Sequence, residues 1–140
     1  MRRVIYASRA VDDLDEVDLL QLLTQARTAN LRNGITGMLM YSSRSFLQLF
    51  EGEDDGVETA WDRIRLDRRH TDLRVLRDGP ADGRLFADWT MGFEHPADED
   101  LEEHLPGYRA SVGYPFLSSL LVLEPETAET LLSLYARRSG

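Results

Sequence analysis

The chain has 140 residues, 42% of them hydrophobic, and a formal net charge of −9. This length suits one domain with a real core, and the acidic balance disfavours nucleic acid, whose phosphates need a basic surface. There is no cysteine, and all 16 basic residues are arginine, which excludes disulfides, thiolate chemistry and Schiff bases.

Strand and helix patterns alternate in the first half of the chain. Residues 3–8 form a short β-prone run with apolar side chains on both faces. Acidic residues within 11–16 mark a helix start, and a leucine stripe continues that helix to about Asn30, shortly before an Asn-Gly pair. Residues 35–41 and 46–51 predict a hairpin closed by a tight turn.

The second half begins with another helix and ends in an acidic tail. Residues 54–64 carry apolar side chains at i, i+3, i+4 and i+7 spacing, which predicts a helix. Residues 73–76 and 89–93 are plausible strands, separated by turn-forming residues at 78–83.

The tail from residue 96 combines a loop with helical segments. We expect a short helix at 98–105, and an apolar run follows at 116–123. A last helix is expected over 125–138, with Pro125 in its first turn.

The order of these elements predicts an α+β fold, a ferredoxin-like sandwich with a five-stranded mixed sheet. Right-handed crossovers place the two long helices on one face of the sheet. A bare apolar face on the other side would be a liability, so we expect the C-terminal helices to cap it.

Gln48 is the most unusual residue of the predicted strands. Side chains alternate across a strand, so Phe46, Gln48 and Phe50 share one face while Leu47 and Leu49 share the other. Both faces are apolar apart from this one amide. Burying an amide without partners costs roughly 2–7 kcal/mol, so the sequence predicts a hydrogen-bonding partner for Gln48, and a ligand is a serious candidate.

Three further polar features have structural as well as functional explanations. Tyr6 lies mid-strand, where a core tyrosine bonded to backbone is the commoner explanation. Asn30 is either a cap of the first helix or a ligand contact. Arg63 and Asp67, at i and i+4, either pair on the surface or belong to a basic cluster at 62–70 that binds an anion.

No single motif indicates a reaction. The sequence has no G-x-G-x-x-G and no Walker loop, and no serine lies in a nucleophile elbow. His70, His95 and His104 are scattered without metal-ligand spacing. We therefore expect neither a metal site nor a catalytic group.

Six short segments carry more information together than any of them does alone. They are Ile5-Tyr6-Ala7-Ser8, Ala26-Arg27 with Asn30, Gly34-Ile35-Thr36-Gly37, Phe46-Leu47-Gln48-Leu49-Phe50-Glu51-Gly52, Ile64 with Asp67-Arg68-Arg69-His70, and Arg84-Leu85-Phe86-Ala87-Asp88-Trp89-Thr90-Met91. In this order and spacing, over about residues 3–93, they resemble the BLUF family of flavin-binding blue-light sensors.

The resemblance implies a non-covalently bound FAD, or FMN, between the two helices. Tyr6 would be the light-driven electron and proton donor, and Gln48 would bridge Tyr6 to the flavin and rearrange on illumination. Trp89 or Met91 would sense the altered amide from the last strand. The other cofactor contacts would come from Asn30, Arg63, Ile64, Asp67, Arg69 and His70.

The resemblance also implies a flavin-binding domain at 1–95 and a C-terminal helical cap at 96–140. Such a photoreceptor is not an enzyme, and it would signal through the cap to a separate, unidentified protein. Members of this kind commonly self-associate, so we expect a homo-oligomer.

Two other functions compete with light sensing. One is a small ferredoxin-like hydrolase of the acylphosphatase type, using Arg and Asn on a bound phosphate, but the glycine-rich phosphate loop is absent. The other is a flavin redox enzyme, which needs a substrate pocket. No apolar run approaches the ~20 residues of a membrane span, and the N-terminus does not resemble a signal peptide, so we expect a cytoplasmic protein.

Overall fold

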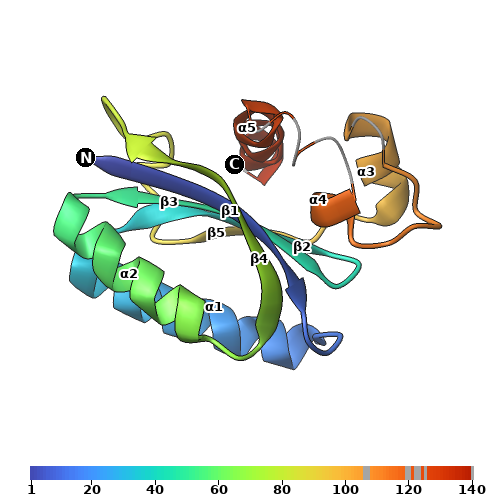
Figure 1. The fold of residues 1–140 in the computed structure, drawn as a ribbon, viewed down its shortest axis with the longest axis horizontal. Coiled ribbons are helices and arrows are strands. Elements are labelled where there is room, and N and C mark those ends of the chain that lie inside the picture. The colour runs from blue at the N-terminus through green and yellow to red at the C-terminus, as the bar shows by residue number, and fades with distance from the viewer. Residues whose placement is uncertain (106–107, 119–120, 122–123, 125, 140) are drawn as a thin grey trace.

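A five-stranded sheet forms the centre of the molecule (Figure 1). The computed structural model describes residues 1–105, 108–118, 121, 124 and 126–139. The strands are β1 (Arg2–Ala10), β2 (Thr36–Ser42), β3 (Ser45–Gly52), β4 (His70–Pro80) and β5 (Gly92–Glu94). They lie in the order β4-β1-β3-β2-β5, with β2 and β5 parallel and every other neighbouring pair antiparallel. The predicted ferredoxin-like arrangement with one added strand is confirmed.

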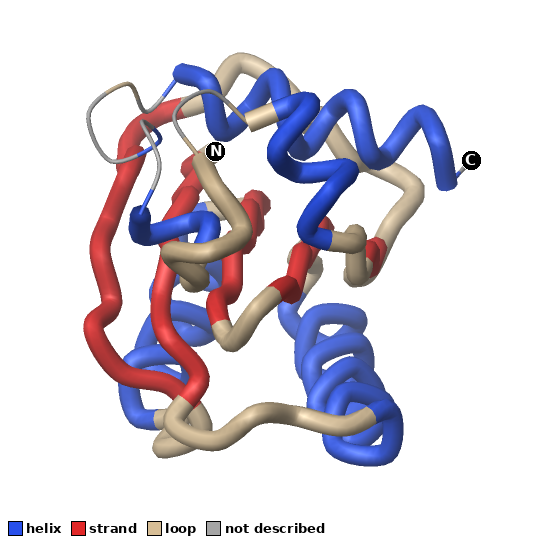
Figure 2. Tube along the Cα trace, turned by 90° about the vertical axis from the view of Figure 1, so that its right-hand side faces the viewer, coloured by secondary structure: helices blue, strands red, loops and turns tan. Residues whose placement is uncertain are grey.

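Helices cover both faces of this sheet. They are α1 (Glu16–Asn33), α2 (Asp54–Leu66), α3 (Asp98–His104), α4 (Pro115–Ser118) and α5 (Glu126–Ser139). Figure 1 and Figure 2 show α1 and α2 on one face and the three C-terminal helices on the other. Apolar side chains of the tail pack against Ile5, Met38, Leu47 and Leu49 of the sheet, which confirms the predicted cap.

The two long helices form where local sequence favours them. α1 begins with a capping box, in which the Asp15 carboxylate accepts from the Asp18 N–H at 2.8 Å and the Asp18 carboxylate accepts from the Asp15 N–H at 3.2 Å. It runs to Asn33, slightly beyond the predicted end, and stops at Gly34, whose φ of 67° is left-handed. α2 buries the whole apolar stripe that its sequence predicts.

Strand β4 is longer than the predicted range of 73–76. It continues through Asp78 and Pro80, where the sequence indicated a loop. Its end pairs with the start of β1, and the Nε of Arg2 donates to Asp78 at 2.7 Å. Pairing between distant segments therefore outweighs the local turn preference, and Pro80 is tolerated because β4 is an edge strand.

Strand β5 starts at Gly92 instead of Trp89. The carbonyls of Thr90 and Met91 both accept hydrogen bonds from side chains of α1, at 2.7 Å and 3.0 Å. Successive carbonyls of an extended strand point in opposite directions, so the chain is bent at these two residues. Pairing with β2 can begin only after the bend.

The tail agrees with its predicted helices where the structure describes it. α3 falls within 98–105, and α4 begins at the apolar run. Pro125, predicted in the first turn of the last helix, and parts of the run 116–123 lie outside the described residues. Within the described ranges, no helix has both the length and the apolar character that a bilayer span requires.

Candidate functional site

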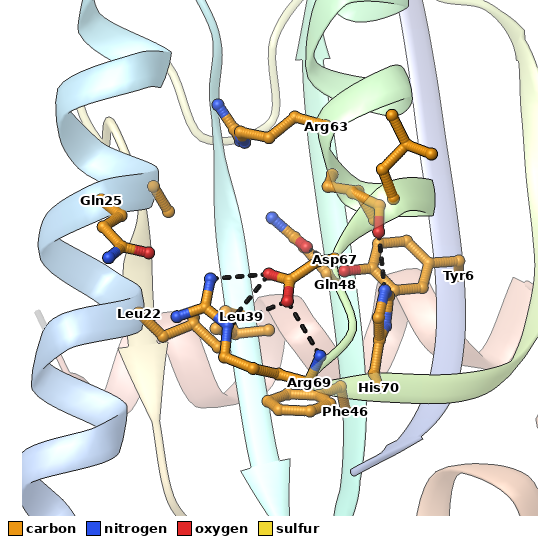
Figure 3. A pocket seen from close by; sticks show the side chains of 13 residues that line it. Tyr6, Leu22, Gln25, Leu39, Phe46, Gln48, Arg63, Asp67, Arg69 and His70 are labelled. Atoms are coloured by element: carbon orange, nitrogen blue, oxygen red, sulfur yellow. Dashed lines mark hydrogen bonds and ion pairs between the residues drawn. The ribbon is translucent and has the colours of Figure 1, made fainter. Parts of the chain in front are cut away.

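A cavity of about 430 Å³ lies between α1 and α2, on the face of the sheet that these two helices cover (Figure 3). Its size falls within the range of roughly 300–1,000 Å³ that is typical of small-molecule sites. All the predicted cofactor contacts except Asn30 line it. The lining residues are Tyr6, Leu22, Gln25, Ala26, Leu39, Phe46, Gln48, Arg63, Ile64, Leu66, Asp67, Arg69 and His70.

Gln48 lies at the centre of the cavity floor, directly opposite Tyr6 in the antiparallel pairing of β1 and β3. The Tyr6 hydroxyl donates to the Gln48 Oε1, and the Gln48 Nε2 donates to the sulfur of Met91 at 3.6 Å. Both side chains are almost fully buried, with Tyr6 4% and Gln48 5% exposed. The amide therefore has one partner at each end, as its burial requires.

The predicted alternation along β3 is confirmed. Phe46 and Phe50 pack in the clusters on the α1–α2 side, whereas Leu47 and Leu49 belong to the cluster under the C-terminal helices. Gln48 thus faces the cavity because a strand has a side-chain period of two.

Tyr6 is held in an aromatic environment. Its ring centroid lies 5.5 Å from that of Trp61, 6.3 Å from that of Phe50 and 5.9 Å from that of His70. Burial, together with the nearby charge of Asp67, raises the pKa of the Tyr6 hydroxyl above its ordinary value. The phenol therefore keeps its proton over the whole physiological pH range.

Asn30 lies just outside the cavity and links it to the segment before β5. Its side chain is 1% exposed, its Nδ2 donates to the Thr90 carbonyl at 2.7 Å, and its Oδ1 accepts from Arg63 at 3.2 Å. Asn30 is not the cap of α1, because Gly34 ends that helix. Burial lowers the pKa of Arg63, although its guanidinium remains charged.

Asp67 and Arg69 form an ion pair beside the cavity. The Arg69 guanidinium donates to Asp67 at 2.6 Å and 2.9 Å, and the Arg69 backbone N–H donates to it at 3.0 Å. Burial would raise the pKa of Asp67, but these hydrogen bonds outweigh it and hold that pKa below its usual value. Asp67 pairs with Arg69, not with Arg63 as the i, i+4 spacing suggested.

His70 joins the end of α2 to the sheet. Its Nε2 lies 2.7 Å from the Ile64 carbonyl, and its Nδ1 lies 2.7 Å from the Ser8 hydroxyl. A carbonyl can only accept, so Nε2 carries a proton and donates to it. In the neutral ring the Ser8 hydroxyl then donates to Nδ1, which fixes the orientation of the imidazole.

Trp89 and Met91 lie on opposite sides of the last part of the sheet. Met91 is buried and contacts Gln48. Trp89 does not line the cavity, and its ring stacks on Phe86 at 5.9 Å and packs against the core under the C-terminal helices. Of the two candidates for sensing the amide, Met91 has the direct contact.

Residues 83–91, here called the strap, form most of the connection between β4 and β5 and have no regular secondary structure. Contacts from four other elements hold the strap in place. In chain order they are Arg3 to the Gly83 carbonyl, Arg84 to Thr36 and the Gly34 carbonyl, Glu51 to the Phe86 N–H, the Gly37 N–H to the Trp89 carbonyl, Asn30 to the Thr90 carbonyl, and Arg27 to the Met91 carbonyl. The position of Met91 therefore depends on long-range contacts.

The wall that α1 contributes to the cavity contains no predicted cofactor contact, although Ala26 belongs to one of the family-like segments. Leu22, Gln25 and Ala26 line it, and their i, i+3, i+4 spacing places them on one helix face. That spacing was visible in the sequence, but which face of α1 is turned toward α2 becomes clear only from the packing of the two helices. Leu66, which is 80% exposed, lines the cavity from α2.

A family model described as "Sensors of blue-light using FAD" matches residues 1–92. The chain belongs to the BLUF family. It is therefore a blue-light sensor that uses FAD, and the hydrolase alternative is not supported. The matched region, residues 1–92, is the part of the chain that the family describes as a sensor.

Curated relatives and solved structures agree with this family. The chain is 39% identical over 98 residues to the photoactivated adenylate cyclase subunit beta of Euglena longa, a match that covers 68% of this chain and 11% of the relative. The corresponding Euglena gracilis subunit is 38% identical over 98 residues, with the same 68% and 11% covered. The chain thus spans about a tenth of the length of these relatives.

Two solved structures match nearly the whole BLUF chain. BlrB, described as a BLUF protein in its dark state, has a TM-score of 0.72 and 26% identity, with 94% of this chain and 95% of BlrB covered. BlsA in its photo-activated state has a TM-score of 0.74 and 28% identity, with 94% of this chain and 91% of BlsA covered.

The residues around the BLUF cavity fit a flavin ring. Apolar side chains of α1, α2 and the sheet form walls suited to a flat aromatic system. Figure 3 shows the Gln48 amide and the Arg63 guanidinium directed toward the space between the helices. An amide and a guanidinium offer the donors that the carbonyl groups and ring nitrogens of a flavin accept.

Proposed function

We propose that the chain senses blue light through the contacts Tyr6–Gln48–Met91. A change in the hydrogen bonds of the Gln48 amide moves Met91, and the strap and C-terminal helices pass this change to a separate protein. The observation that carries the proposal is the buried amide with a different partner at each end.

The two ends of the Gln48 amide are not equivalent. In the observed orientation the Oε1 accepts from a hydroxyl and the Nε2 donates to a thioether, which is a weak acceptor. Reversing the amide would set the Oε1 against a sulfur that has no proton to give. The two orientations therefore differ in energy and in how they hold Met91, and a buried network of this kind has strict donor–acceptor requirements.

When bound, FAD supplies the absorption of blue light and the capacity to accept an electron and a proton. Tyr6 is the proposed donor of both, because it lines the cavity and its hydroxyl is hydrogen-bonded to the Gln48 amide. Gln48 links the Tyr6 hydroxyl to the cavity. The residues proposed to hold the cofactor are Tyr6, Asn30, Gln48, Arg63, Ile64, Asp67, Arg69 and His70.

The output of the sensor is part of the same proposal. We assign residues 1–95 to flavin binding and residues 96–140 to an output cap, and we propose that the protein works as a homo-oligomer in the cytoplasm. In the Euglena relatives the matched region belongs to a photoactivated adenylate cyclase subunit. By analogy, the region found here acts on an effector, which we propose is a separate protein.

Absorption spectroscopy of the FAD-loaded protein tests the proposal. Blue light should shift the flavin absorption to the red, and the shift should recover in the dark. Tyr6→Phe and Gln48→Leu should each abolish the shift. Tyr41→Phe is the matched control, since Tyr41 is equally buried but its hydroxyl donates to Asp13, away from the cavity.

Two results would contradict the proposal. A wild-type protein that binds FAD without any light-induced shift would refute light sensing itself. A Gln48→Leu protein that keeps the full shift would refute the role of the amide.

A further inference from the structure

We propose that Glu51, together with Arg3 and Glu129, couples the strap to helix α5, so that the sensor site and the cap move together. Glu51 is a positioning residue in this account, because it contacts neither the cavity nor the proposed light-driven groups. Its use in light signalling rests on the proposed function, whereas the coupling itself does not.

Glu51 joins two segments that are far apart in sequence. It is fully buried in β3. Its Oε1 accepts from the Arg3 Nε at 2.9 Å, and its Oε2 accepts from the Phe86 N–H at 2.8 Å. One carboxylate therefore binds both β1 and the strap, and charged hydrogen bonds of this kind are short and directional.

Strand alternation places Glu51 on the cap side of the sheet. It lies two residues beyond Leu49, whose side chain packs under the C-terminal helices, and it pairs with Arg3 across β1 and β3. The Gln48 side chain projects to the opposite face. The same strand thus carries the sensing amide on one face and the strap anchor on the other.

Arg3 extends the contact from Glu51 to α5. Its second guanidinium nitrogen donates to the Gly83 carbonyl at 2.6 Å, and its third lies 3.9 Å from the Glu129 carboxylate of α5. Glu129 also accepts from Arg77 of β4. Negative and positive side chains therefore alternate along a row, from Glu51 of β3 to Arg3 of β1, then to Glu129 of α5. Arg77 of β4 ends the row.

The strap connects this charged row to the sensing amide. The last residue of the strap is Met91, which contacts Gln48, and Phe86, nearer its start, is anchored by Glu51. The Phe86 ring packs in the same cluster as Leu132 and Tyr135 of α5. A displacement of Met91 that is passed on through the strap would therefore change the contacts of both Glu51 and α5.

Stability alone does not account for the buried pair. Apolar residues of similar volume often stabilise a core as well as a buried ion pair does. The Arg3–Glu51 pair has directional hydrogen bonds and contacts the strap, the sheet and α5. The position of each of these three parts therefore depends on the positions of the other two.

Hydrogen–deuterium exchange of the FAD-loaded full chain tests the coupling, first in the dark. Coupling between two sites is reciprocal, so a change at either site should affect the other. Glu129→Gln should therefore speed the exchange of backbone amide hydrogens in the strap by about fivefold, and Glu51→Gln should do the same in α5. Glu126→Gln, an exposed residue on the same helix, is the matched control and should leave the strap unchanged. Because Glu129 is partly exposed, its variant should fold even where Glu51→Gln does not.

The same variants under blue light test the link to signalling. Wild type should show a light-induced change of exchange in α5, and Glu129→Gln should lose most of this change while keeping the full red shift of the flavin. If Glu129→Gln leaves strap exchange in the dark unchanged, the coupling is overturned. A wild type without a red shift would refute the proposed function, yet the dark experiment would still decide the coupling.

Discussion

Removing the Glu51 carboxylate should destabilise the protein far more than removing a surface charge. Glu51 is fully buried and Arg3 is 7% exposed, so Glu51→Ala leaves a guanidinium in the interior without its main partner. Breaking a buried pair costs about 3–5 kcal/mol, and the unpaired Phe86 N–H adds about 1–3 kcal/mol. Whole domains are stable by about 5–15 kcal/mol, which places Glu51→Ala near the limit of folding.

Urea unfolding of the FAD-loaded protein measures these losses. Glu51→Gln keeps an acceptor oxygen and should cost less, about 1–3 kcal/mol. The double variant Arg3→Met, Glu51→Leu removes both charges and should cost less than Glu51→Ala alone. Arg2→Met is the matched control, because the partners of Arg2, Asp78 and Glu58, are partly exposed, and it should cost about 0–1 kcal/mol.

Two outcomes would refute this reasoning. A loss for Glu51→Ala as small as that for Arg2→Met would mean that water solvates the Arg3 guanidinium in the folded protein. The single variants Arg3→Met and Glu51→Leu complete the comparison. If the loss of the double variant equals the sum of their two losses, Arg3 and Glu51 do not interact, since contacting residues are not additive.

Three further predictions concern pH and packing. The difference in the free energy of unfolding between wild type and Asp67→Asn should be constant above about pH 5 and should shrink as pH falls below about 4. The reason is that the pKa of Asp67 is lowered in the folded state, which therefore binds fewer protons than the unfolded state in this pH range. Urea unfolding at each pH measures this difference. Above about pH 10 wild type should lose stability relative to Tyr6→Phe, because the unfolded tyrosine releases its proton before the buried one does. Gly92→Ala should displace the Trp89 ring, because the added Cβ would lie 2.0 Å from it; near-ultraviolet circular dichroism should change, with unchanged far-ultraviolet spectra.

Local sequence patterns predicted the side-chain orientations of strand β3 well. The alternation of Phe46, Gln48 and Phe50 against Leu47 and Leu49 depends only on the pleat of β3, so the face of each side chain could be derived without knowing the fold. The need for a partner at Gln48 followed from the cost of burying an amide. Local sequence could not identify Met91 as that partner over Trp89.

The strap could not be predicted in this way. Its path is determined by hydrogen bonds to side chains such as Asn30 and Glu51, which lie far away in sequence. No pattern within residues 83–91 indicates these contacts. The same is true of β4, whose Asp78 and Pro80 indicate a turn until β1 pairs with them. Asn30 was equally ambiguous, because its choice of the Thr90 carbonyl over a capping role depends on tertiary structure.

The short strand β5 should open more often than the other strands of the sheet. It pairs with β2 over three residues, from Met38 opposite Gly92 to Met40 opposite Glu94, whereas β1 and β3 pair over eight. Local opening requires least free energy where the fewest hydrogen bonds must break. Thermal fluctuations should therefore release β5 many times before they disturb the rest of the sheet, giving the strand next to Met91 a lifetime far shorter than that of the folded protein.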